Sequence, residues 1–120
     1  TFRRRLLVLD KAHALLVDIN RVAPGIRRAH HQPLKRQLVK SALSTSSNIA
    51  EGRTKKSERE FLRFLEIALG SAASYSINQA AIDCRAISAH EGGDLSNRAE
   101  EVAKMLQGLS RRIREDLGES

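Results

Sequence analysis

Apolar residues recur at steps of three and four along most of this chain, which is the spacing of one face of an α-helix. The pattern is most regular near the end of the sequence, where the apolar positions are Leu95, Ala99, Val102, Leu106, Leu109, Ile113 and Leu117. A stripe of this kind predicts an amphipathic helix packed on a core. No segment alternates apolar and polar residues in the way of a half-buried strand.

Turn and capping residues set the boundaries of the other helical segments. The pair Pro24-Gly25 ends the first segment. Pro33 suits the first turn of the second, where its missing N–H costs nothing. Ser57 and Glu60 form a capping box that opens the third. The turn Glu91-Gly92-Gly93-Asp94 is expected to precede the fourth. We therefore predict an all-α protein, an antiparallel up-down four-helix bundle in a single domain, with helices at about residues 5–23, 33–51, 58–89 and 95–117.

A polar bend joins the second predicted helix to the third. Gly52 is expected just after the second helix, because glycine adopts positive φ without strain. Asn48 and Glu51 are expected to satisfy backbone groups near that helix end; a surface for a partner is the alternative interpretation. Gly70 lies inside the third helix, where glycine costs about 1 kcal/mol relative to alanine. The run of small residues from Gly70 to Ser74 therefore predicts a close approach of another helix.

The composition fits a small helical domain without an intrachain disulfide. Of the 120 residues 41% are apolar but only 3% are aromatic, so the core must consist of Leu, Ile, Val and Ala. Cys84 is the single cysteine, which fits a reducing compartment. No stretch reaches the roughly 20 apolar residues of a membrane span. We expect a cytoplasmic protein with no membrane segment.

The formal charge of +7 is divided unevenly along the chain. Residues 1–63 carry 15 Lys and Arg against 5 Asp and Glu, whereas residues 64–120 carry 6 against 9. Such an asymmetry favours a polyanionic partner; the alternative is a helical surface that is simply solvated. The predicted nucleic-acid contact is a basic strip formed by Lys35, Arg36, Lys40, Arg53, Lys55, Lys56, Arg59 and Arg63. Because aromatic residues are scarce, binding by charge and shape is favoured over base stacking.

The sequence offers little for catalysis or for a bound cofactor. It contains no glycine-rich phosphate loop, and no histidine follows a glutamate at the spacing that di-metal carboxylate bundles use. The adjacent His30 and His31 are more often solvent-exposed loop residues than metal ligands. Cys84 is more often a packed small hydrophobe than a nucleophile. We predict a non-enzymatic protein with no metal and no cofactor.

Two motifs together resemble a known family. They are S-T-S-S-N-I-A-E-G-R at residues 44–53 and F-L-R-F-L-E-I-A-L-G-S at residues 61–71. Bacterial four-helix bundle proteins encoded in intervening sequences of 23S ribosomal RNA genes typically carry S-I-P-x-N-I-A-E-G, a basic loop and F-L-x-I-A-L-G-S. The spacing is similar, although Thr45 and Ser46 stand in place of the usual Ile-Pro.

The resemblance implies a four-helix bundle that assembles into a homopentamer. It also implies kinship with the accessory variability determinant of diversity-generating retroelements, a pentameric bundle that binds a reverse transcriptase and nucleic acid. We therefore hold two main hypotheses. One is an oligomeric bundle that binds RNA or DNA, with or without a reverse-transcriptase-like partner. The other is a structural or protein-interaction scaffold whose charge serves solubility; an enzyme is a third interpretation, which would require an organised polar pocket or a metal.

Overall fold

The computed structural model describes residues 2–72 and 74–119, and gives the surroundings of their side chains outside positions 74–77. Every regular element in these ranges is helical. The α-helices are α1 (Phe2–Val22), α2 (Gln32–Arg53), α3 (Glu58–Ser71), α4 (Ser74–Asp83) and α5 (Ala89–Asp116), and the short 3₁₀ helices η1 (Ala23–Gly25) and η2 (Ala29–His31) lie between α1 and α2. The predicted all-α class is confirmed, with five α-helices in the described ranges instead of four.

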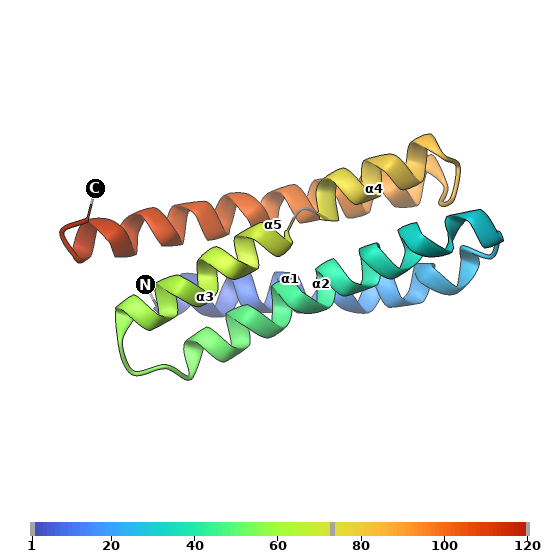
Figure 1. Cartoon of the computed structure of the whole chain (residues 1–120). Helices are drawn as coiled ribbons and strands as arrows, with labels where there is room; N and C mark the ends of the chain where they lie inside the picture. The colour runs from blue at the N-terminus through green and yellow to red at the C-terminus, as the bar shows by residue number, and fades with distance from the viewer. Residues whose placement is uncertain (1, 73, 120) are drawn as a thin grey trace.

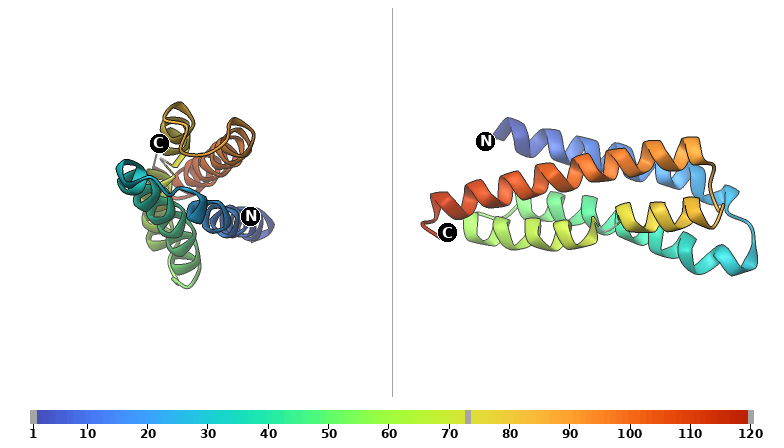
Figure 2. Two further views of the ribbon diagram at one scale, coloured as in Figure 1. Left: turned by 90° about the vertical axis from the view of Figure 1, so that its right-hand side faces the viewer. Right: turned by 90° about the horizontal axis from the view of Figure 1, so that it is seen from above.

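The helices run back and forth along one long axis of a molecule that measures 48 × 21 × 20 Å. In Figure 1, α1 and α2 run in opposite directions, α3 and α4 follow one another in the direction of α1, and α5 returns. We call the end with the α1–α2 connection (residues 23–31) the hairpin end. The opposite end, which holds the α2–α3 connection (residues 54–57) and both termini, is the loop end (Figure 2).

Buried side chains form two clusters, one toward each end. The cluster toward the loop end contains Val8, Ala12, Ile49, Phe61, Leu62, Leu65, Ala68, Ala72, Val102, Leu106, Leu109 and Ile113. The cluster toward the hairpin end contains Leu15, Ile19, Ile26, Leu38, Ala42, Ala81, Ile87, Leu95 and Ala99. The stripe predicted on the last helix is buried from Leu95 to Ile113, and Leu117 packs half-buried against it. Burial of this apolar surface is the main force that holds the helices together.

The single helix predicted at residues 58–89 is two helices in the structure, α3 and α4, and the prediction is wrong at residues 84–88. α4 ends at Asp83 in a Schellman turn, in which the Ala86 N–H donates to the Ala81 carbonyl (2.8 Å) and the Arg85 N–H to the Ile82 carbonyl (2.9 Å). Arg85 has a φ of 59°, at the position that glycine usually holds. An arginine in this place gives no sequence signal of a helix end.

The turn predicted at residues 91–94 is also wrong, because these residues lie inside α5. Ser88 caps this helix: its Oγ accepts from the Glu91 N–H (3.2 Å) and lies 3.1 Å from the Glu91 carboxylate. Gly92 serves a close helix contact, since a Cβ there would lie 2.3 Å from Ile82 Cγ1. The glycine that suggested a turn is therefore a packing residue between α4 and α5.

The two glycines singled out near the α2–α3 bend also differ from expectation. Gly52 lies inside α2 and is buried, and a Cβ there would lie 2.8 Å from Phe64 Cβ and 2.9 Å from Phe61 Cδ1. It permits close packing of α2 on α3 and does not terminate the helix. Gly70 is exposed, and a Cβ there would meet nothing within 4 Å. The close approach predicted at Gly70 is thus not found; the side chains at positions 73–74 lie outside the described part.

The polar residues of the bend join α2 to its surroundings without capping it. Asn48 Nδ2 donates to the Ser44 carbonyl (2.8 Å) and lies 3.2 Å from Ser44 Oγ, one turn back. Ser44 Oγ is in turn 2.7 Å from Ser71 Oγ of α3. The Glu51 carboxylate accepts from Lys55 Nζ at 3.1 Å. The predicted capping role is therefore wrong, whereas the structural interpretation of these residues fits their contacts.

Candidate nucleic-acid interface

The structure divides the predicted basic strip between the two ends of the molecule. Lys35, Arg36 and Lys40 lie on the first half of α2, toward the hairpin end (Figure 1). The remaining members, Arg53, Lys55, Lys56, Arg59 and Arg63, lie at the loop end. The helix between Arg36 and Arg53 is about 26 Å long at 1.5 Å per residue. The eight cations therefore do not form one continuous patch.

The cations on the first half of α2 face solvent without carboxylate partners. Arg36 and Lys40 are exposed, and each is two residues, or about 200° of helix rotation, from the buried Leu38. Lys35 is half-buried beside them. Within the described ranges none of the three forms an ion pair, although ten other pairs are present. Their charges are free to attract an external anion.

Two further cations extend this surface and were missed by the sequence prediction. Arg27 and Arg28 are exposed in the α1–α2 connection, and they too have no carboxylate partner among the described residues. A sequence signal existed, because residues 19–50 contain six Lys and Arg and no Asp or Glu. We define the hairpin cluster as Arg27, Arg28, Lys35, Arg36 and Lys40.

Backbone contacts hold the connection that presents Arg27 and Arg28. Ile26 is 1% exposed, and its N–H donates to the Ala23 carbonyl at 2.9 Å. Gln32 Nε2 donates to the Ile26 carbonyl (3.0 Å) and to the Arg28 carbonyl (3.1 Å). The buried Ile26 and the Gln32 amide therefore hold the backbone on both sides of the two arginines. This reduces the conformational entropy that is lost when the arginines bind a ligand.

A pair of histidines, His30 and His31, follows these arginines in the α1–α2 connection. His30 is exposed, but His31 is buried, and their rings lie 4.2 Å apart. The expectation that both are solvent-exposed is wrong for His31. Burial lowers the pKa of His31, and the neighbouring His30 and Arg28 lower it further. His31, a neighbour of Arg28 in the hairpin cluster, is therefore harder to protonate than an ordinary histidine.

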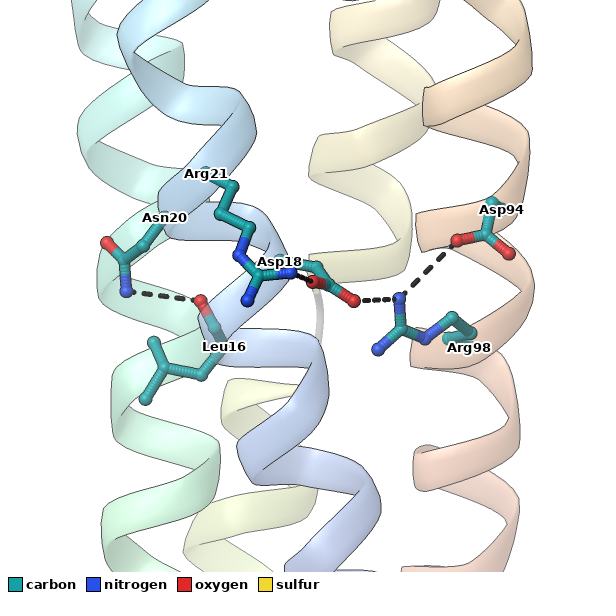
Figure 3. A network of polar contacts seen from close by, with 6 residues as sticks. All are labelled: Leu16, Asp18, Asn20, Arg21, Asp94 and Arg98. Carbon is teal, nitrogen blue, oxygen red and sulfur yellow. Dashed lines mark hydrogen bonds and ion pairs between the residues drawn. The ribbon is translucent and has the colours of Figure 1, made fainter.

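Asp18 is the last carboxylate before residues 19–50, which contain no Asp or Glu, and its charge is neutralised by neighbouring arginines. Asp18 of α1 accepts from Arg98 Nη1 of α5 (2.7 Å) and from Arg21 Nη1 (3.2 Å), and Arg98 also reaches Asp94 (3.4 Å) (Figure 3). Burial has the largest single effect and lowers the pKa of Arg98, but the hydrogen bonds and negative charges of Asp18 and Asp94 together outweigh it, so that the pKa is raised overall. This network fastens α1 to α5 and removes Asp18 as a source of repulsion.

Two of the five predicted cations at the loop end are engaged within the protein. Lys55 pairs with Glu51 at 3.1 Å, and Arg59 pairs with Glu119 near the C-terminal end of the described chain. Arg53, Lys56 and Arg63 have no carboxylate partner in the ranges described. The loop end therefore keeps three of its five predicted cations free of carboxylates.

An additional arginine fastens the loop end. Arg5 forms a two-point pair with Glu58, with Nη1–Oε1 and Nη2–Oε2 distances of 3.0 and 2.5 Å. Its guanidinium also lies 4.5 Å from the centre of the Phe61 ring. The hydrogen bond from Arg5 lowers the pKa of Glu58. This contact ties the start of α1 to the start of α3, where Ser57 Oγ accepts from the Glu60 N–H (3.0 Å) as the predicted capping box requires.

Phe61 and Phe64 near these cations are already in use, whereas Phe2 is 70% exposed with its ring centre 5.9 Å from the Arg53 guanidinium. Lys55 Nζ and the Arg63 guanidinium lie 5.2 and 5.8 Å from the centre of the Phe64 ring. Phe61 is 2% exposed. Base stacking requires an open aromatic face, which neither ring offers. The arrangement can bind phosphate, and its chemistry favours backbone contacts over base contacts.

Comparison with known proteins decides the family of this chain. The family model for the 23S rRNA-intervening sequence protein matches residues 4–108. The chain belongs to this family. A crystal structure of a protein of unknown function from the S23 ribosomal protein family of Bacteroides thetaiotaomicron has a TM-score of 0.80, with 22% identity over 90% of this chain and 98% of that chain. No curated protein matches. The family resemblance seen in the two motifs is confirmed, and the solved structure supports the helical fold.

The described residues contain neither a metal-binding cluster nor a membrane-spanning helix. Among the residues described, no group of three or more His, Cys, Asp or Glu is placed to hold a metal ion. Cys84 is exposed, so its predicted role as a packed hydrophobe is wrong. No helix within the described ranges is long and apolar enough to cross a bilayer.

Proposed function

We propose that this member of the 23S rRNA-intervening sequence protein family is a non-enzymatic, oligomeric bundle that binds RNA or DNA through the phosphates. In this proposal the chain is an antiparallel four-helix bundle, with α3 and α4 together as its third rod. The hairpin cluster is the principal contact. The observation that carries the proposal is that five Lys and Arg, four of them exposed and Lys35 half-buried, have no carboxylate partner among the described residues, on a segment (residues 19–50) without Asp or Glu.

Physical chemistry supports this assignment over a surface that is merely solvated. An arginine or lysine that already pairs with a carboxylate gains little from a phosphate, because the local field is cancelled. Among the described residues the cations of the hairpin cluster have no carboxylate partner. Each contact that they make with a phosphate therefore releases a condensed counterion. The family takes its name from intervening sequences in 23S ribosomal RNA genes, and the proposal rests on charge rather than on that name.

Fluorescence anisotropy with labelled stem-loop RNA and duplex DNA between 50 and 300 mM salt tests the proposal. If all five cations of the hairpin cluster contact phosphates of B-DNA, the logarithm of the association constant should fall against the logarithm of salt with a slope of about −4.5. Absence of binding at the lowest salt, or a slope near zero, would contradict the proposal.

A protein-interaction scaffold is the second candidate, and exposed apolar side chains favour it. Leu43 and Ile67 are 53% and 43% exposed on the outer sides of α2 and α3. A groove of about 310 Å³ between α1 and α5 is lined by Arg4, Leu7, Met105, Gly108 and Leu109. Surfaces of this kind suit contacts with other chains.

For either candidate, the sequence resemblance to the accessory variability determinant implies a specific assembly, a ring of five copies with a reverse-transcriptase-like partner. Sedimentation equilibrium at micromolar concentration should then show a pentamer. A monomer would contradict the oligomer. A partner protein that is recovered after nuclease treatment, together with no affinity for nucleic acid, would favour the scaffold over the binding protein.

A further inference from the structure

We propose that the bound nucleic acid is a double helix that lies along the outer face of α2 and contacts both ends of the molecule at once. This inference rests on the proposed function and specifies its ligand. The hairpin cluster supplies one contact. The unpaired cations of the loop end, which are Arg53, Lys56 and Arg63, supply the other.

The surface between the two contacts is free of repulsive charge. The exposed residues on the outer side of α2 between Lys40 and Arg53 include Leu43, Ser47 and Ala50, which are uncharged. The first carboxylate after Asp18 in the sequence is Glu51, and its charge is offset by Lys55 at 3.1 Å. A phosphate backbone that follows α2 therefore meets cations at each end and an uncharged ridge between them.

The spacing of the two contacts is fixed by the fold. α2 is one uninterrupted helix from Gln32 to Arg53, and it packs against α1, α3 and α4. The distance of about 26 Å between Arg36 and Arg53 corresponds to roughly 8 base pairs, since a duplex turn of about 10 base pairs measures about 34 Å. Lys40 is about 20 Å from Arg53 along the helix, so a duplex must be at least about 8 base pairs long to join the loop end to the hairpin cluster beyond Lys40.

The rigid spacing of the two contacts favours a duplex over a single strand, and the largely exposed ring of Phe2 lies beside Arg53 at the loop end only. A duplex presents phosphates at a fixed separation and is stiff over about 150 base pairs. A single strand must be ordered to span the same distance, which costs conformational entropy. Recognition of single strands usually recovers this cost by stacking bases on aromatic rings, and Phe64 is occupied by Lys55 and Arg63.

Two-point attachment predicts a threshold in duplex length. Once the hairpin cluster is bound, the loop-end cations reach the same duplex at a high effective concentration. A stem shorter than about 8 base pairs reaches from Arg53 only as far as Lys40, so it cannot engage the rest of the hairpin cluster and the loop end at the same time. Affinity should therefore rise sharply between short and long stems, beyond the gain that comes from the larger number of binding positions.

The test compares stem-loops that share one loop and have stems of about 6 and about 14 base pairs, made as RNA and as DNA. Each is titrated with the wild type and with the triple variant Arg53→Gln, Lys56→Gln, Arg63→Gln. The matched control is the variant Lys11→Gln, Lys104→Gln, Arg112→Gln. It removes the same charge from three cations of α1 and α5 that each pair with a carboxylate of α5. Thermal melts establish that each variant folds, and Lys56→Gln alone, in the exposed connection, replaces the triple variant if that variant unfolds.

We expect the wild type and the control to bind the longer stem at least about tenfold more tightly than the shorter one. The gap should shrink to less than about threefold in the triple variant, and by a smaller factor in Lys56→Gln alone. A preference for RNA or for DNA stems supports the inference in either case and identifies the source of the phosphates.

Equal affinity for both stems would overturn the inference, as would a gap that persists in the triple variant. Tighter binding of a single strand of the same length would also overturn it. Each of these results leaves phosphate binding at the hairpin cluster intact. Absence of binding to every probe would instead contradict the proposed function, so the two failures are distinguishable.

Discussion

The hairpin end and the loop end are both rich in Lys and Arg, but they use these residues differently. At the loop end Arg5, Lys55 and Arg59 pair with Glu58, Glu51 and Glu119. At the hairpin end the five residues of the hairpin cluster have no such partners in the described chain. A cation beside a carboxylate contributes little to the field that an approaching polyanion meets. The comparison teaches that the pairing of charges, more than their number, locates a phosphate-binding surface.

The difference follows from what each end must do structurally. The loop end joins three helices and both terminal segments, and ion pairs between distant segments help to hold them together. The hairpin end is closed by the buried Ile26 and by amide contacts from Gln32. Its cations are therefore not needed for packing. Substitutions of the paired cations at the loop end should change stability, whereas substitutions in the hairpin cluster should change binding.

The largest effect on stability is expected from Gly52→Ala. The new methyl group would lie 2.8 Å from Phe64 Cβ, an atom that cannot move without the backbone of α3. Overpacking of this kind should destabilise the protein by about 1–3 kcal/mol. Gly70→Ala is the matched control, because its methyl group meets nothing within 4 Å, and it should stabilise the helix by about 0.5–1 kcal/mol. Urea unfolding measures both, and a similar shift in the two variants would contradict the packing role of Gly52.

A smaller loss is expected from Arg5→Gln, which removes the pair with Glu58 and the contact with the Phe61 ring. The pair is partly exposed, at 25% and 49% for the two side chains, so solvent screening limits its contribution to about 0.2–1 kcal/mol. A double-mutant cycle with Glu58→Gln isolates this coupling. Arg36→Gln at the hairpin end should stay within about 0.5 kcal/mol of the wild type. A larger loss for Arg36→Gln would contradict the division between the two ends.

The smallest effect is a difference in the pH dependence of stability between the ends. The folded state lowers the pKa of His31, so the unfolded chain binds more protons, and the stability from this group is lost as the pH falls below about 6.5. The folded state also lowers the pKa of Glu58, and that contribution disappears only at more acidic pH. His31→Gln should flatten the urea midpoint between about pH 7 and pH 5. Glu58→Gln should leave this window unchanged, and the reverse pattern would contradict the assignment.

Much of the fold could be predicted from the sequence, because apolar periodicity reports burial directly. The prediction that the face of α5 from Leu95 to Ile113 is buried is correct for this reason. The errors lie where a residue has an unusual local role. Arg85 occupies the left-handed position that glycine usually fills, and Gly92 serves packing where a glycine more often marks a turn. These roles depend on the neighbouring helix, which a local pattern cannot report.

The candidate site could be predicted only in part. Eight cations were identified, and the acid-free run that adds Arg27 and Arg28 was visible in the sequence but overlooked. The pairing of Arg59 with Glu119 and of Arg5 with Glu58 joins residues far apart in the chain. Such partners depend on the tertiary fold, so charge counting alone could not separate the free cations from the engaged ones.

The most direct test compares two triple variants that remove the same charge from opposite ends. The substitutions are Arg28→Gln, Arg36→Gln and Lys40→Gln at the hairpin end, and Arg5→Gln, Lys55→Gln and Arg59→Gln at the loop end. The salt dependence of binding to a duplex DNA of about 14 base pairs is measured for both. The hairpin variant should lose about 2.7 from the magnitude of the salt slope, and the loop variant less than about 1. Equal losses, or a larger loss for the loop variant, would contradict the claim that unpaired cations at the hairpin end bind the phosphates.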